Sequence, residues 1–153
     1  LGEGSTFHVY IPRLENVVMV ESVSRSEGIP TGDEHILFVD DEPGLVDVGK
    51  EMLGHLGYQV VTRTSSMDAL ELFRAEPELF DLVITDMTMP HMTGDALAGE
   101  LMKIRPDITI ILCTGYSERI SEEKAKEMDI KAFLMKPLML RDLAETIRKV
   151  LDE

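Results

Sequence analysis

Five short apolar runs alternate with segments of helical character between His35 and Leu151, and no other feature of the sequence constrains the fold as strongly. The expected strands cover residues 36–39, 58–62, 82–85, 108–112 and 132–135. Most of these runs are apolar at successive positions rather than at alternate ones, which is typical of strands buried on both faces of a sheet. The sequence therefore predicts a parallel sheet whose five strands are joined by helices.

The intervening segments carry residues that begin and end helices. Pro43 suits the first turn of a helix, because its missing N–H would be unpaired there, and Gly57 suits the position after the end. Ser65 or Ser66 can cap the second helix. The first expected helix runs from Pro43 to about residue 56, and the second contains Ala69, Leu70, Leu72 and Phe73. The others cover residues 95–104, about 117 or 121 to 128, and 139–151. Short connections imply helices on both faces, so the expected fold is α/β, a flavodoxin-like (βα)5 doubly wound parallel sheet with strand order 2-1-3-4-5.

Polar side chains stand where four of the predicted strands end. Asp40 and Asp41 follow the first strand, Asp86 the third, Thr114 the fourth and Lys136 the fifth. Ligands of such sheets bind at the carboxyl ends of the strands, so we expect the three carboxylates to converge there. Their repulsion favours a shared hard cation with oxygen ligands, most simply Mg²⁺. Lys136 and Thr114 could then neutralise the oxygens of a phosphoryl group on Asp86.

Composition excludes several other classes of protein. The formal net charge of -14 argues against binding nucleic acid, and it favours a cation in the site and partners with a basic face. The single cysteine, Cys113, excludes a disulfide framework or a zinc cluster. No apolar stretch approaches the ~18 residues of a membrane span and no signal peptide opens the chain, so we expect a cytoplasmic location without membrane contact. Leu1 in place of Met indicates a fragment of a longer protein.

Residues 35–152 resemble a response-regulator receiver domain. The matching motifs are Asp40-Asp41, Asp86 with Met89-Pro90 and Gly94, Thr114-Gly115, and Lys136-Pro137. The resemblance implies that Asp86 takes a phosphoryl group from phosphohistidine. It also implies an Mg²⁺ site in which Asp41 and Asp86 are direct ligands, Asp40 acts mainly through water, and the backbone carbonyl of Thr88 completes the set.

The resemblance further implies a mechanism and a conformational output. Asp86 attacks phosphorus in line while Lys136 and Thr114 balance the charge, and water later hydrolyses the acyl phosphate. The chain would thus phosphorylate and dephosphorylate itself without a kinase active site. Thr114 is expected to move toward the phosphoryl group and Phe133 to turn inward, as the two switch residues. Phe133 stands where tyrosine is frequent, so a readout through a hydroxyl is lost. A cis peptide at Lys136-Pro137 is common in this family.

The segment before the first strand indicates the origin of the chain. Residues 1–14, with a Gly-x-Gly-Ser-Thr-Phe string and Pro12, resemble the closing strand of the ATP-binding domain of sensor histidine kinases. We expect residues 15–34 to be an interdomain linker and residues 35–153 the receiver domain. This arrangement points to the C-terminal part of a hybrid sensor histidine kinase. Its partner would be a phosphohistidine-bearing dimerisation domain or a histidine phosphotransfer domain.

Two other functions compete with this interpretation. A stand-alone receiver, or an interaction module that works without phosphorylation, would share the fold, but the intact set of polar strand ends argues against a degenerate site. A phosphatase with an aspartyl nucleophile commonly has an Asp-x-Asp signature, and Thr88 occupies the second Asp position here.

Overall fold

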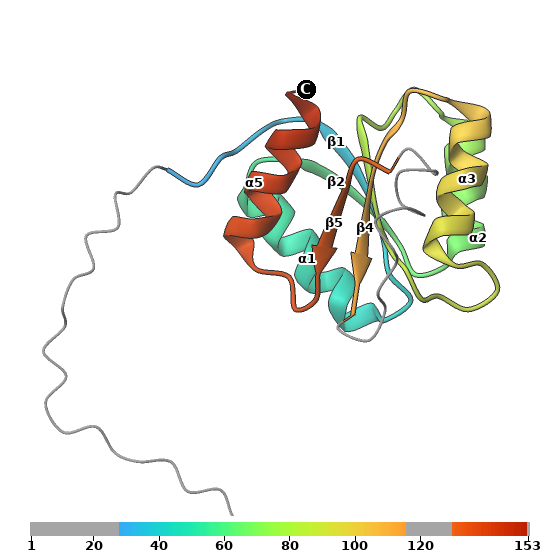
Figure 1. Ribbon diagram of the computed structural model, residues 1–153, viewed down its shortest axis with the longest axis horizontal. Coiled ribbons are helices and arrows are strands. Elements are labelled where there is room, and N and C mark those ends of the chain that lie inside the picture. Colours follow the sequence, from blue (N-terminus) through green and yellow to red (C-terminus); the bar gives the residue numbers. More distant parts are fainter. Residues whose placement is uncertain (1–27, 116–129, 153) are drawn as a thin grey trace, which may run out of the picture.

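The computed structural model describes residues 28–115 and 130–152. Five parallel strands form one sheet in the order β2-β1-β3-β4-β5, which confirms the predicted topology (Figure 1). The strands are β1 (His35–Val39), β2 (Gln59–Arg63), β3 (Leu82–Asp86), β4 (Thr109–Thr114) and β5 (Ala132–Met135). The helices are α1 (Pro43–His55), α2 (Ser66–Ala75), α3 (Gly94–Ile104) and α5 (Leu140–Leu151). The helix expected near 117–128 and the strand expected in residues 1–14 lie outside the described residues.

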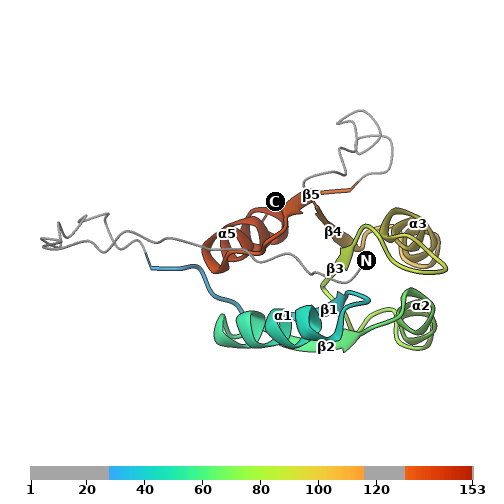
Figure 2. The same cartoon turned by 90° about the horizontal axis from the view of Figure 1, so that it is seen from below.

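Two apolar layers enclose the sheet (Figure 2). Helices α1 and α5 cover one face and helices α2 and α3 the other. In β1, Ile36 and Phe38 join the first layer and Leu37 and Val39 the second, because successive side chains of a strand point to opposite faces. The strand is buried on both sides, as its unbroken apolar run predicted.

The predicted helix signals act as expected, with small shifts of the boundaries. Pro43 is the first residue of α1, and the Ser65 hydroxyl accepts a hydrogen bond of 3.3 Å from the Asp68 backbone N–H at the start of α2. Gly57 adopts a φ of +97°, a conformation that other residues avoid. Strands β3 and β4 extend further than predicted, so that Asp86 and Thr114 are themselves the last residues of their strands.

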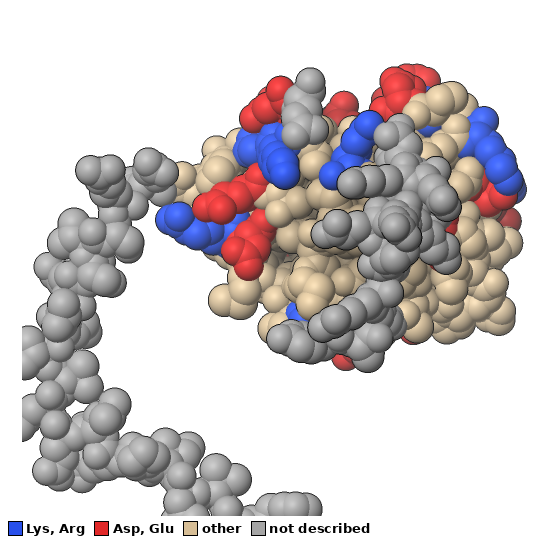
Figure 3. All heavy atoms as spheres, in the orientation of Figure 1, with Lys and Arg blue, Asp and Glu red and all other residues tan. Residues whose placement is uncertain are grey.

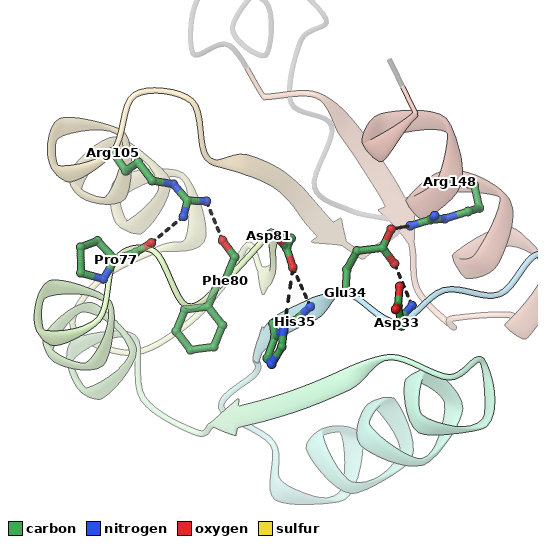
Figure 4. Close-up of polar contacts among 8 residues, drawn as sticks. All are labelled: Asp33, Glu34, His35, Pro77, Phe80, Asp81, Arg105 and Arg148. Atoms are coloured by element: carbon green, nitrogen blue, oxygen red, sulfur yellow. Dashed lines mark hydrogen bonds and ion pairs between the residues drawn. The ribbon is translucent and has the colours of Figure 1, made fainter.

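Arginine side chains hold together the edge of the sheet where the strands begin, here called the amino edge (Figure 4). The Arg105 guanidinium donates hydrogen bonds of 2.6 Å to the carbonyls of both Pro77 and Phe80, and it thereby ties the end of α3 to the loop before β3. On the other side, Arg148 of α5 lies 2.5 Å from the Glu34 carboxylate.

The segment before β1 is also fastened to this edge. The Gly32 N–H donates to the Leu56 carbonyl at 3.1 Å, and the Gln59 N–H donates to the Glu34 carbonyl at 3.0 Å. A Cβ on Gly57 would meet the Gly32 carbonyl oxygen at 2.5 Å, so the two stretches of chain can approach only because residue 57 is a glycine. Ordered contacts with the domain therefore begin before His35.

The outer surface mixes both signs of charge. On the face shown in Figure 3, the Lys and Arg side chains of the described residues are interleaved with Asp and Glu. Among the described helices, none has the length and apolar character needed to cross a membrane.

Candidate active site

Three side chains from three strand ends lie in direct contact at the opposite, carboxyl edge of the sheet. The Lys136 ammonium lies 2.7 Å from Asp40 Oδ2 and 2.6 Å from Asp86 Oδ1. The strand order produces this contact, because β3 is flanked by β1 and β4, and β4 in turn carries β5. One lysine therefore bridges two carboxylates that belong to neighbouring strands.

Asp86 is held from several directions. It ends β3, is 6% exposed, and accepts a 3.1 Å hydrogen bond from the Thr88 N–H on the oxygen that does not face Lys136. The Gly94 N–H donates to the Met87 carbonyl at 2.9 Å and closes the loop that follows. A Cβ on Gly94 would collide with the Asp86 carbonyl oxygen, so only glycine allows the loop to lie this close to the aspartate.

Asp40 is equally fixed, whereas Asp41 is not part of the contact. Asp40 is 2% exposed, and one of its carboxylate oxygens accepts from the Glu42 N–H at 3.0 Å while the other faces Lys136. Asp41 is exposed. Within the described residues, no three His, Cys, Asp or Glu side chains are grouped so that they could hold a metal ion.

Of the three carboxylates expected at this edge, the structure brings Asp40 and Asp86 into contact with a common cation. That cation is Lys136, which belongs to the protein itself. The sequence predicted the edge at which Lys136 lies, but it predicted that the ammonium would contact a phosphoryl group rather than the two carboxylates. In the resting site the ammonium lowers its energy by contacting both buried acids.

The charges of the site are incompletely balanced. Burial, the largest influence, raises the pKa of Asp86 above its ordinary value, although the hydrogen bond and charge of Lys136 act in the opposite direction. Burial alone would lower the pKa of Lys136, but its bonds to Asp40 and Asp86 outweigh burial and raise it. With both carboxylates ionised, the trio has one negative charge in excess.

The donors present fit a hard divalent cation. Asp40 and Asp86 offer carboxylate oxygens side by side, and the excess negative charge together with the raised pKa of Asp86 would be relieved by a cation. Because two carboxylates give few protein ligands, such an ion would keep water, as Mg²⁺ does. Asp41 follows Asp40 directly in the sequence, and Thr88 lies two residues after Asp86.

Thr114 and Phe133 lie on the strands beyond β3. Thr114 is 4% exposed, and its hydroxyl donates to Met135 Sδ at 3.5 Å. Phe133 is half-buried in β5. Sequence reasoning missed the contact with Met135, although pairing the ends of β4 and β5 in parallel register would have placed the two residues side by side. The Lys136-Pro137 peptide is cis, as expected.

Comparison with known families decides what kind of domain this is. The family described as response regulator receiver domain matches residues 36–148. The chain belongs to this family. It is therefore a receiver domain of a two-component system.

Relatives of this receiver domain are found in several kinds of protein. The sensor kinase CckA of Brucella abortus is 31% identical over an alignment that covers 100% of this chain and 17% of CckA. The transcriptional regulatory protein GlrR of Escherichia coli is 33% identical, with 78% of this chain and 26% of GlrR covered. The chain thus spans less than a third of these relatives.

Solved structures have the same fold. A response regulator receiver domain protein of Clostridium thermocellum shares 31% identity with a TM-score of 0.74, covering 78% of this chain and 94% of that one. A CheY-like receiver protein of Methanospirillum hungatei shares 32% identity with a TM-score of 0.70, covering 79% and 95% of the two chains. The chemotaxis protein CheY4 of Vibrio cholerae shares 26% identity with a TM-score of 0.69, covering 78% and 100%.

Proposed function

We propose that this receiver domain accepts a phosphoryl group from a phosphohistidine onto the carboxylate of Asp86 and changes conformation in response. The observation that carries the proposal is the bridge of Lys136 between Asp40 and Asp86, at 2.7 and 2.6 Å. A lysine placed so close to the acceptor can move onto the oxygens of an incoming phosphoryl group without leaving the site. Thr114, on the next strand, supplies a hydroxyl donor at the same edge.

The transfer follows from the charges of these groups. An oxygen of Asp86 attacks phosphorus in line, the bond between phosphorus and the imidazole nitrogen breaks, and the electron pair leaves with the imidazole. No general base is needed, because the attacking carboxylate is ionised. Lys136 and the Thr114 hydroxyl balance the charge of the transferred oxygens. Water later attacks the acyl phosphate and regenerates Asp86, so the domain also resets itself.

Asp40, Asp41 and Asp86, with the Thr88 carbonyl, would hold the Mg²⁺ that this chemistry uses. When bound, the ion neutralises charge on the phosphoryl oxygens as a Lewis acid. In this arrangement Asp40 also orients the lysine, since its second oxygen is fixed by the Glu42 N–H. The switch residues would be Thr114, which approaches the new group, and the half-buried Phe133, which follows it.

We infer that the donor belongs to a sensor kinase pathway and that the parent protein is a hybrid histidine kinase. The similarity to the sensor kinase CckA extends over the whole chain, including residues 1–35, which precede the family match. The donor would be a phosphohistidine of a kinase dimerisation domain or of a histidine phosphotransfer domain, in the cytoplasm. The acidic net charge of -14 disfavours nucleic acid as a partner.

A hollow between α1 and α5 is a candidate docking surface for a helix that carries the histidine. Its volume is about 230 Å³, and it is lined by Val48, Glu51, Met52, His55 and Leu140. Val48 is 52% exposed and therefore accessible to a partner. Helix α1 begins just after Asp41 and α5 begins shortly after Lys136, so both helices that form the hollow start at the edge of the sheet that carries the acceptor.

The test is phosphorylation of the whole chain by acetyl phosphate and by a phosphorylated histidine donor, with Mg²⁺. We expect the mass of one phosphoryl group to be added to the parent and to the control Asp107→Asn, whose exposed side chain lies at the amino edge, but not to Asp86→Asn. Equal labelling of Asp86→Asn would overturn the proposal. A parent that binds a partner yet shows neither labelling nor a response to beryllofluoride would instead be an interaction module that works without phosphorylation.

A further inference from the structure

Met135 lies where it can control the Thr114 hydroxyl. The two residues are register partners at the ends of β5 and β4, so their side chains project from the same face of the sheet. The Thr114 hydroxyl donates to Met135 Sδ at 3.5 Å. Thr114 is buried, so water has little access to this hydroxyl, and losing the acceptor would leave a shielded donor unsatisfied.

Core packing does not explain a methionine at this position. Met135 is 54% exposed, and β5 is the edge strand of the sheet, so the side chain has only one neighbouring strand. The backbone keeps its sulfur beside Thr114, because the Lys136 N–H donates to the Thr114 carbonyl at 2.9 Å. The cation of the site and the sulfur that faces Thr114 therefore occupy adjacent positions of one strand end.

We propose that Met135 is a positioning residue that holds the Thr114 hydroxyl in its resting orientation and releases it when a phosphoryl oxygen appears on Asp86. This inference rests on the function proposed above. A thioether is a weak acceptor, whereas hydrogen bonds to charged oxygens are roughly twice as strong as neutral ones. The contact thus satisfies the hydroxyl at rest, yet costs little to break when the switch operates.

A weaker or a stronger hydrogen-bond acceptor at residue 135 should change the affinity for beryllofluoride in opposite directions. Met135→Leu keeps the size and removes the acceptor, so the hydroxyl loses its resting partner. Met135→Gln supplies a stronger amide acceptor and should hold the hydroxyl back. In titrations of the whole chain with beryllofluoride and Mg²⁺, followed by NMR, we expect about two- to fivefold tighter binding for Met135→Leu and about two- to fivefold weaker binding for Met135→Gln.

The variant Thr114→Val shows whether residue 135 affects beryllofluoride binding through the Thr114 hydroxyl or only by changing the surface near the site. Without the hydroxyl, beryllofluoride binding should weaken, and the leucine and glutamine variants should then bind alike in that background. A difference that persists in Thr114→Val would overturn the inference, as would equal affinities of the parent, Met135→Leu and Met135→Gln when Thr114 is intact. Met67→Leu is the control, because it changes an exposed methionine that lies on α2, and it should bind beryllofluoride with the affinity of the parent.

The two proposals fail in different ways. If the parent responds to beryllofluoride and the residue 135 variants do not differ, the role of Met135 is wrong and the phosphoacceptor function stands. If the parent itself shows no response, both are wrong. Thermal unfolding of each variant checks that the chain is folded, and we expect a slightly lower midpoint for Met135→Leu, because it leaves the buried Thr114 hydroxyl without its acceptor.

Discussion

The two edges of the sheet use positive charge in different ways. At the amino edge, Arg105 donates to the carbonyls of Pro77 and Phe80, and Arg148 contacts Glu34 (Figure 4). At the carboxyl edge, Lys136 bridges two buried carboxylates. Both edges join segments that are distant in the sequence, so the contrast lies in the chemistry of the groups joined.

The difference follows from the shapes of the two side chains. A guanidinium is a planar fork whose donors can bind two fixed acceptors at once, which suits a permanent connection between loops. An ammonium is a compact charge on a flexible stem, and it can exchange one oxygen partner for another. The acceptors of Arg105 and Lys136 differ in the same sense, since backbone carbonyls keep one state whereas carboxylates can be protonated, metallated or phosphorylated. One edge therefore maintains the fold and the other can react.

Removing the lysine should produce the largest effect. In Lys136→Met, Asp40 and Asp86 remain buried with no cation between them, so we expect labelling by acetyl phosphate to fall roughly 100-fold. Unfolding in urea should show a loss of about 2 kcal/mol at neutral pH, part of which Mg²⁺ restores. The exposed Lys149→Met is the matched control. Labelling of Lys136→Met at the parent rate would contradict the role given to the carboxyl edge.

Breaking the amino edge should cost stability without affecting chemistry. Arg105→Met removes two hydrogen bonds from a charged donor and a guanidinium placed 5.6 Å from the Phe73 ring centre, for an expected loss of about 2–3 kcal/mol. Arg105→Lys should recover less than half of this, because an ammonium cannot reproduce the fork. Both folded variants should be phosphorylated at the parent rate, and a slower rate would mean that the two edges are coupled.

Neutralising the acceptor should stabilise the protein. The folded state raises the pKa of Asp86, so it binds a proton more tightly than the unfolded state, and stability falls as the pH rises from the ordinary value of 3.8 through the raised one. At neutral pH we therefore expect Asp86→Asn to be more stable than the parent by about 1 kcal/mol. Urea unfolding should show the gain shrinking as the pH is lowered toward 3.8; a gain that is independent of pH would refute this explanation.

The contact between Glu34 and Arg148 should give the smallest effect, with the opposite dependence on pH. Burial, the largest single influence, would raise the pKa of Glu34, but the hydrogen bond and charge of Arg148 and the backbone hydrogen bonds of Glu34 and Asp33 together outweigh it and lower the pKa below the ordinary value of 4.5. The contact thus stabilises the fold above pH 4.5, and this contribution is lost as the pH falls through the lowered pKa. Glu34→Gln should cost about 0.5–1 kcal/mol at pH 7 and nothing in strong acid. Urea unfolding at several pH values, with Glu145→Gln as the exposed control, measures this cost.

The fold and the location of the site could be predicted from sequence because both depend on local patterns. Unbroken apolar runs identified the strands, and the strand order then fixed which strand ends are neighbours. That reasoning brought Asp40, Asp86 and Lys136 to one edge, where the structure places them in contact.

What could not be predicted depends on side-chain direction and on longer-range packing. The pattern of residues treats Asp40 and Asp41 alike, and only the folded chain shows that Asp40 is buried while Asp41 is exposed. The weak acceptor beside Thr114 requires the register of two strands. The glycines and proline before His35 indicate a linker, so the close approach of Gly32 to Gly57 was not anticipated.

The attachment of residues 32–34 has a consequence for how a donor in the same polypeptide could approach. The preceding chain reaches the domain at the amino edge, whereas Asp86 lies at the far end of a five-residue strand, about 17 Å away. Any tethered donor must therefore extend from the amino edge to the opposite, carboxyl edge before it faces the aspartate. Because Gly32 and Glu34 are held at the amino edge, this part of the chain leaves the carboxyl edge open to a second molecule as readily as to its own chain.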